Sequence, residues 1–319
     1  MRIFSAGIIV VLLVPQILFL VQEKQRGPIT RAKRPKFEKT EGVFFNNLFE
    51  EALVGERPKN LGSANQPKIV KNGDTSSSGD SSSASSGESY PWSKLIGAGT
   101  IEDEVKSIKI NLDKTITTPT KFASGDSKIA RVDYSVLAML FAIVSEYDGE
   151  VKWKKYAGGA RDAFAKCAAN ASTSTEQAYQ QAKQRKQDLA DMLNGGSVSF
   201  NNSDEANDWS KICDRTPLML RLKIAYREVL KPGTANAGEF KSNKEIIARE
   251  AALIAAIGEV LTRDGMEDGD DEGYASHAKT MTKGALDILE AIKLDNVELA
   301  GKAAGVIDQA CDKCHEDWK

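Results

Sequence analysis

The stretch Leu299-Ala-Gly-Lys-Ala-Ala-Gly-Val-Ile-Asp-Gln-Ala310-Cys311-Asp-Lys-Cys314-His315 carries the strongest pattern in this sequence. Its apolar residues are spaced as on one face of an α-helix: Leu299, Ala303, Val306 and Ala310. Cys311, Cys314 and His315 are related by i, i+3 and i+4, so they share one helix face as well. We therefore expect a helix over residues 297–317 that presents two thiols and an imidazole side by side.

Cys311, Cys314 and His315 form Cys-x-x-Cys-His, the attachment pattern of a c-type haem. The two thiols can add to the haem vinyl groups as thioethers, and the imidazole can bind the iron. With 4 Cys and 2 His in the chain, chance would give this pattern only about 3 × 10⁻⁴ times. A dithiol redox pair prefers a helix N-terminus, and a zinc site needs four ligands. We expect one covalent haem c, attached through both cysteines and bound by His315.

The composition and the other motifs of the sequence limit which further functions we expect. The net charge is only −2, although 28% of the residues are charged. The chain therefore lacks the strong positive charge that would indicate nucleic-acid binding. We find no nucleophile–base set and no phosphate-binding glycine loop, and therefore expect no enzymatic activity. Cys167 and Cys213 could be buried apolar residues or a disulfide pair, because sequence does not fix their separation. His277 lacks a metal partner at i+3 or i+4, and the acidic stretch 264–272 violates the calcium-loop pattern.

The first ninety residues have the composition of an export or anchoring region. An apolar run over residues 1–21 predicts a signal segment or a membrane anchor. A polar tether with one short apolar helix is expected over 22–74, and a Ser/Gly-rich linker over 75–91. The basic residues after the run would hold the chain in the cytoplasm by the positive-inside rule. Haem attachment takes place outside the cytoplasmic membrane, and we give that chemistry more weight and expect a periplasmic or extracytoplasmic protein.

From residue 92 onward the apolar pattern is helical, and no window alternates as a strand does. Eight helices are expected, over 101–116, 127–147, 154–170, 175–193, 215–230, 243–262, 273–293 and 297–317. A second apolar face runs along the sixth of them: Ile247, Ala251, Ile254, Gly258 and Leu261. Capping boxes beginning at Ser174 and Ser242 mark two of the starts. The expected fold class is all-α.

The eight helices divide into two sets of four that resemble each other. Tyr156-Ala-Gly-Gly-Ala-Arg161 aligns with Tyr274-Ala-Ser-His-Ala-Lys279, as an internal repeat would. We expect two tandem four-helix bundles, over 92–203 and 204–319. In this alignment the first set has apolar residues where the second has Cys-x-x-Cys-His, namely Leu189, Met192 and Leu193. Only the second bundle is therefore expected to hold haem.

A four-helix bundle with Cys-x-x-Cys-His near the end of its last helix resembles the cytochrome c prime family, including its low-spin relatives. The likeness is closest over 210–319, where Trp318 and Lys319 match the aromatic and basic residues of the family's ending. The family's first helix covers the other haem face. The resemblance implies that Arg215 lies near a haem propionate and that Met219 is the distal residue. Leu218 and Leu222 are the alternatives for that position.

The family resemblance also bears on assembly and function. Family members dimerise through their first two helices, so either a dimer or an internal pseudo-dimer with the fused bundle is implied. If Met219 binds iron, the chain is an electron carrier with redox partner proteins. If the iron is five-coordinate, the alternative is binding of a diatomic gas such as NO or CO, as a sink or a sensor.

Overall fold

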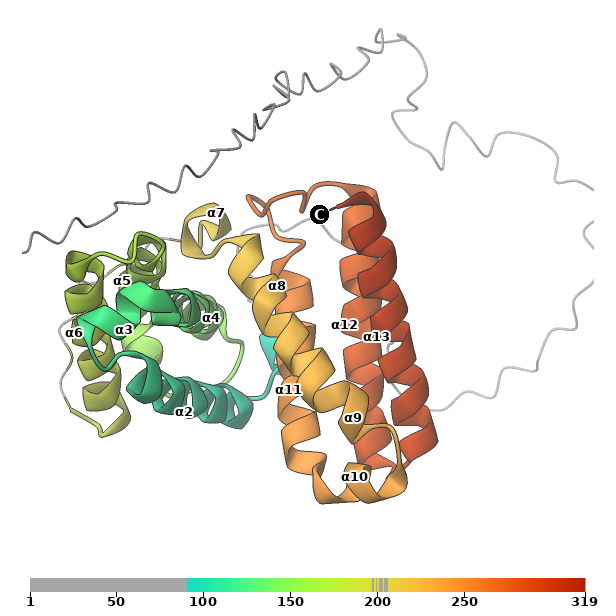
Figure 1. Cartoon of the computed structure of the whole chain (residues 1–319). Helices are drawn as coiled ribbons and strands as arrows, with labels where there is room; N and C mark the ends of the chain where they lie inside the picture. Colours follow the sequence, from blue (N-terminus) through green and yellow to red (C-terminus); the bar gives the residue numbers. More distant parts are fainter. Residues whose placement is uncertain (1–90, 197, 199, 201–202, 204–205, 319) are drawn as a thin grey trace, which may run out of the picture. The chain divides into compact units, whose positions relative to one another are not determined.

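The computed structural model describes residues 91–196, 198, 200, 203 and 206–318. Within these residues every regular element is a helix and none is a strand (Figure 1), which confirms the all-α prediction. No helix in the described part is both long and apolar enough to cross a membrane. The segment and tether predicted over 1–74, and the linker up to residue 90, lie outside the described residues.

Four long helices form what we call the N-terminal helix group (residues 92–193): α2 (Ala98–Thr115), α4 (Ser127–Glu146), α5 (Ala157–Ala171) and α6 (Glu176–Leu193). Shorter elements join them: η1 (Trp92–Lys94), α3 (Pro119–Lys121), the π-helical η2 (Phe122–Asp126) and η3 (Lys154–Tyr156). The helix α4 packs on both α2 and α5. It can do so because its residues 133–144 are all buried, and most of them are apolar.

The C-terminal helix group (residues 209–317) contains the other long helices: α8 (Arg215–Ile224), α11 (Lys244–Val260), α12 (Glu272–Lys293) and α13 (Val297–Asp317). Its short elements are α7 (Trp209–Ile212), the π-helical η4 (Ala225–Leu230), α9 (Lys231–Gly233) and α10 (Ala237–Ser242). The helix α12 packs along α11 and α13, and Figure 1 shows α12 and α13 side by side. The helix α8 continues directly through η4 into α9.

All eight predicted helical ranges are helical, with ends displaced by a few residues at most, although the range 215–230 is divided between α8 and the π-helical η4. Both predicted capping boxes are wrong. Thr175, and not Ser174, caps α6, since its hydroxyl accepts from the Ala178 amide at 3.2 Å. Ser174 instead has a φ of 52°, which places it in the turn before the cap. Ser242 is the last residue of α10, and α11 follows after Asn243 without a side-chain cap.

The structure confirms one of the two predicted apolar faces and corrects part of the other. The face on α11 is confirmed, and that helix is buried on almost every side. On α13, Ala303 and Ala310 are buried as predicted, but Val306 is 38% exposed and its neighbour Ile307 is fully buried in its place. The buried face of α13 consists mainly of small side chains: Ala300, Ala303, Ala304, Ile307 and Ala310.

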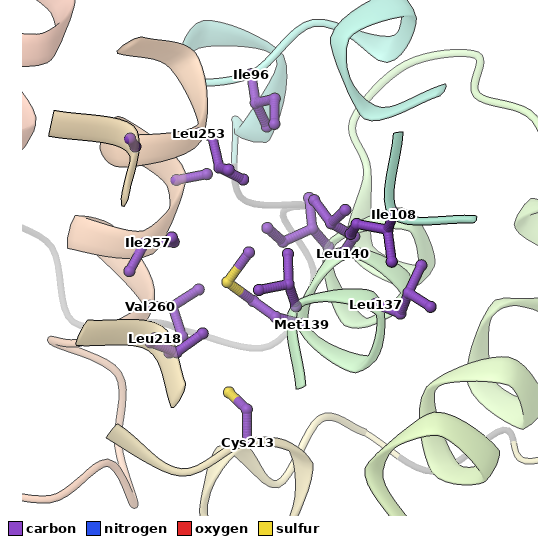
Figure 2. Close-up of a cluster of buried hydrophobic side chains, with 14 of the residues drawn as sticks. Ile96, Ile108, Leu137, Met139, Leu140, Cys213, Leu218, Leu253, Ile257 and Val260 are labelled. Carbon is purple, nitrogen blue, oxygen red and sulfur yellow. The ribbon is translucent and has the colours of Figure 1, made fainter. Parts of the chain in front are cut away.

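An apolar contact joins the two helix groups. The helix α4 packs against α8, and α2 approaches α11. Figure 2 shows Met139 with Ile257 and Val260 on one side and Ile108 and Leu137 on the other. The buried cluster drawn there includes residues of both groups: Ile96, Ile108, Leu137, Met139, Leu140, Cys213, Leu218, Leu253, Ile257 and Val260. One face of α8 is therefore committed to the N-terminal helix group.

Next to this contact lies a buried ionic cluster of Glu104, Arg221, Arg249 and Glu250. Arg221 of α8 pairs with Glu104 of α2 at 2.9 Å and with Glu250 of α11 at 2.7 Å. Arg249 completes the cluster at 3.2 Å from Glu250 and 3.6 Å from Glu104. Both carboxylates are almost fully buried, and burial raises the pKa of Glu104 while Arg221 opposes that shift. Buried charges of this kind require their partners.

Candidate functional site

A cavity of about 540 Å³ opens between α8–η4 on one side and α12 and α13 on the other. All five residues that the sequence predicts for the site line it: Arg215, Met219, Cys311, Cys314 and His315. They come from two helices at opposite ends of the C-terminal helix group in sequence. The structure thus brings the predicted thiols, imidazole, thioether and guanidinium together around one space.

Close helix packing places the two thiols at this cavity. Asn296 caps α13, and its side chain accepts from the Leu299 amide at 3.0 Å. A methyl group on Gly284 of α12 would lie 2.8 Å from the Cγ1 atom of Ile307, so glycine is needed for this approach. The small side chains on the buried face of α13 likewise allow that helix to pack closely against α12. The last turns of α13 then present Cys311 and Cys314, both free and half-buried, beside the exposed His315.

The environment of the two thiols does not favour thiolate chemistry. Burial raises the pKa of the Cys311 thiol to about 11, with Asp308 adding to the shift. Burial also raises the pKa of Cys314, although Arg215 opposes it. A reactive dithiol needs the opposite environment, one that lowers the pKa. Cys167 and Cys213 are likewise free, and burial raises the pKa of each to about 12.

Arg215 lines the cavity and is already paired with carboxylates. Its guanidinium pairs with Glu267 at 2.9 Å and with Asp268 at 2.6 Å. Both acids belong to the stretch 264–272, so this stretch positions an arginine. Within the described residues, no group of three or more His, Cys, Asp or Glu side chains is arranged to hold a metal ion. A haem is compatible with that finding, because its iron needs a single protein imidazole from the proximal side.

The helix α8 offers two of the three distal candidates to the cavity. Met219 is half-buried and lines it, and so does Leu222, which is 6% exposed. Leu218 does not line it, since that side chain is fully buried in the apolar contact between the helix groups (Figure 2). In the N-terminal helix group, Leu189 and Met192 are buried in the core and Leu193 is half-buried.

Sequence reasoning missed four aromatic residues of the lining: Tyr226, Tyr274, His277 and Trp318. The Trp318 ring makes edge contacts with Tyr274 at 6.0 Å and with His277 at 5.9 Å between centroids. A signal for two of them was present, because Tyr274 and His277 share a face of α12 with Ala278 and Met281 at helical spacing. His277 therefore lines the cavity and contacts Trp318. Lys319 lies outside the described residues.

The lining fits a haem in size and chemistry. The volume falls in the range of about 300–1,000 Å³ typical of cofactor pockets. Much of the wall is apolar: Leu222, Ile254, Leu261, Ala278, Met281, Ile307 and Ala310. Two thiols one helical turn apart and a neighbouring imidazole provide the attachment points, and Arg215 adds a guanidinium to the wall. Comparisons with protein-family models, with curated proteins and with solved structures found no match to this chain.

Proposed function

We propose that this chain is a c-type cytochrome that holds one covalent haem in the cavity between α8 and α13 and transfers electrons outside the cytoplasmic membrane. One observation carries the proposal. The Cys-x-x-Cys-His side chains share a single cavity of cofactor size with Met219 and Arg215, which lie about a hundred residues earlier in the chain. A Cys-x-x-Cys-His pattern without this function would need no such cavity.

Different residues of the cavity would attach the haem, bind its iron and surround it. Cys311 and Cys314 would hold the haem by thioether bonds, and His315 would bind the iron. The bound haem supplies an iron that cycles between Fe(II) and Fe(III), with a potential set by axial ligation and burial. The apolar walls exclude water, and Met219 offers a thioether from the opposite helix. A His/Met pair raises the potential.

The arrangement also supports the resemblance to the cytochrome c prime family. In this proposal α8, α11, α12 and α13 form the haem bundle, and α2, α4, α5 and α6 form a haem-less bundle of the same kind. The haem-less bundle packs on α8 and α11, the two helices through which family members dimerise. We propose that it replaces the second copy, as an internal pseudo-dimer, and that residues 1–21 direct or anchor the chain outside the cytoplasm.

Loss of both attachment cysteines tests the proposal. Full-length chain from a host competent in c-type maturation is expected to show a haemochrome spectrum and a haem mass that joins the two tryptic peptides containing Cys311 and Cys314. Cys311→Ala/Cys314→Ala should lose all covalent haem, because each thioether needs its thiol. The matched control is Cys167→Ala/Cys213→Ala, which removes the two other thiols and should keep the haem. A wild-type chain without covalent haem contradicts the proposal.

The second candidate function is gas binding, favoured by Leu222, which lies one turn from Met219 on the same wall and could shield an open iron site. If Met219 binds iron, the ferrous protein should be low-spin and should not react with CO. Met219→Leu should then produce a high-spin ferrous spectrum that changes when CO is added. Met281→Leu is the matched control, because Met281 also lines the cavity and should leave the spectrum unchanged. A wild-type protein that already binds CO favours the gas-binding function.

A further inference from the structure

Tyr274 is the buried tyrosine of the cavity whose hydroxyl has no acceptor. It lies in the first turn of α12, is 1% exposed and lines the cavity. Its hydroxyl proton has no acceptor among the described residues, because the Arg215 guanidinium beside it can only donate. Burial raises the pKa of Tyr274 to about 12 while Arg215 opposes the shift. The hydroxyl is therefore neutral near pH 7 and has a proton to donate.

The other buried tyrosines of the described residues show that this is unusual for the chain. Each of them donates its hydroxyl to a backbone carbonyl: Tyr134 to Ala182, Tyr147 to Ile96, Tyr179 to Thr117 and Tyr226 to Ala304. A buried hydroxyl without an acceptor loses its hydration and gains nothing in return. Tyr226 lines the same cavity and is satisfied, so position in the cavity does not by itself leave a hydroxyl unpaired.

The surroundings fix the Tyr274 ring in place. The Trp318 ring contacts it from one side, with 6.0 Å between centroids. A methyl group on Gly273 would come within 2.8 Å of the Cη2 atom of Trp318, so the glycine makes room for this contact. The Arg215 guanidinium lies 5.7 Å from the Tyr274 ring centroid. A rigid phenol and a guanidinium thus stand together in the wall of the cavity.

A phenol beside a guanidinium suits a carboxylate. Carboxylate oxygens accept from both donors, and bonds to an ionised acceptor are among the strong ones. Arg215 already pairs with Glu267 and Asp268, so its charge is largely offset. The Tyr274 hydroxyl is then the donor that remains uncommitted beside Arg215.

We propose that Tyr274 donates a hydrogen bond to a carboxylate of the molecule that fills the cavity, next to Arg215. This inference rests on the proposed function, under which that carboxylate is a haem propionate. Tyr274 is thus a residue that positions the cofactor and holds no covalent bond to it.

The matched pair Tyr274→Phe and Tyr226→Phe tests the inference in two states of the full chain. In the haem-free chain, made without the maturation system, Tyr274→Phe removes no existing bond and should not lower the unfolding midpoint. Tyr226→Phe removes its bond to Ala304 and should lower that midpoint. In the haem-loaded chain, by contrast, Tyr274→Phe should lower the unfolding midpoint, because the bond to the carboxylate is lost. Phe keeps the ring packing against Trp318 in either state.

Resonance Raman spectra of the haem-loaded proteins identify the acceptor. The propionate bending band should shift in Tyr274→Phe and stay in place in Tyr226→Phe. Covalent haem with an unchanged band in Tyr274→Phe overturns this inference alone. So does a haem-free Tyr274→Phe protein destabilised as much as Tyr226→Phe. A wild-type chain that carries no covalent haem overturns the proposed function as well, so the two failures are distinct.

Discussion

Replacement of Arg221 by Met is expected to destabilise the chain by about 3–5 kcal/mol, the usual cost of removing one partner from a buried ion pair. Arg221 lies between Glu104 and Glu250, whose side chains are only 2% and 4% exposed. Without it, two carboxylates remain buried with Arg249 as their remaining partner in the cluster. Urea unfolding of the full chain, followed by circular dichroism at pH 7, measures the loss.

The control for this prediction is Arg131→Met. Arg131 of α4 pairs with Asp214 at 2.6 Å, also between the two helix groups, but these side chains are 32% and 61% exposed. An exposed pair contributes roughly 0–1 kcal/mol, so this variant should change little. The triple variant Arg221→Met/Glu104→Gln/Glu250→Gln should recover much of the stability, because it leaves no unpaired charge. Equal losses in Arg221→Met and Arg131→Met would contradict the argument.

The same cluster shows where sequence reasoning stops. Helix positions follow from apolar periodicity within each segment, which is a local property, and the eight ranges were predictable for that reason. Arg221 and Glu104 lie 117 residues apart in the sequence, and a charged residue with helical spacing looks like a solvated face. Only the packing of the two helix groups against each other shows that the pair is buried. The error at Val306 has a related cause, because Ile307 and Val306 fit the periodicity almost equally well.

Some residues of the candidate site could likewise be predicted from the sequence, and others could not. Cys311, Cys314 and His315 were predictable because the pattern is local and rare. Placement of Arg215 and Met219 at the same cavity needed a family resemblance, since no local rule joins α8 to α13. Tyr274 and Trp318 were not predicted, because their roles depend on which atoms they contact: an aromatic residue in an apolar pattern indicates core packing until its hydroxyl is seen to lack a partner.

Asp133 should make the stability of the chain fall as the pH rises. Burial raises its pKa to about 7, and Glu104 adds to the shift, while the Asn111 amide at 2.7 Å and the Arg221 guanidinium oppose it. In the unfolded chain the pKa is about 3.9. Between about pH 4 and pH 7 the folded chain therefore keeps a proton that the unfolded chain has lost. Below that window Asp133 has no effect, and above it the full cost of a buried carboxylate applies.

Asp133→Asn removes this cost and should keep the contact with Asn111, because an amide oxygen can still accept from it. The variant and the wild type should have similar stability at pH 4.5, whereas at pH 8 the variant should be more stable by roughly 2–4 kcal/mol, since each pKa unit corresponds to about 1.4 kcal/mol. Urea midpoints at the two pH values measure the difference. The control is Asp113→Asn, whose carboxylate on α2 is well exposed and pairs with Lys109, and which should change neither midpoint by much. If the wild type and Asp133→Asn lose stability equally from pH 4.5 to pH 8, then Asp133 is ionised in the folded chain throughout, and the cluster around Arg221 compensates its charge.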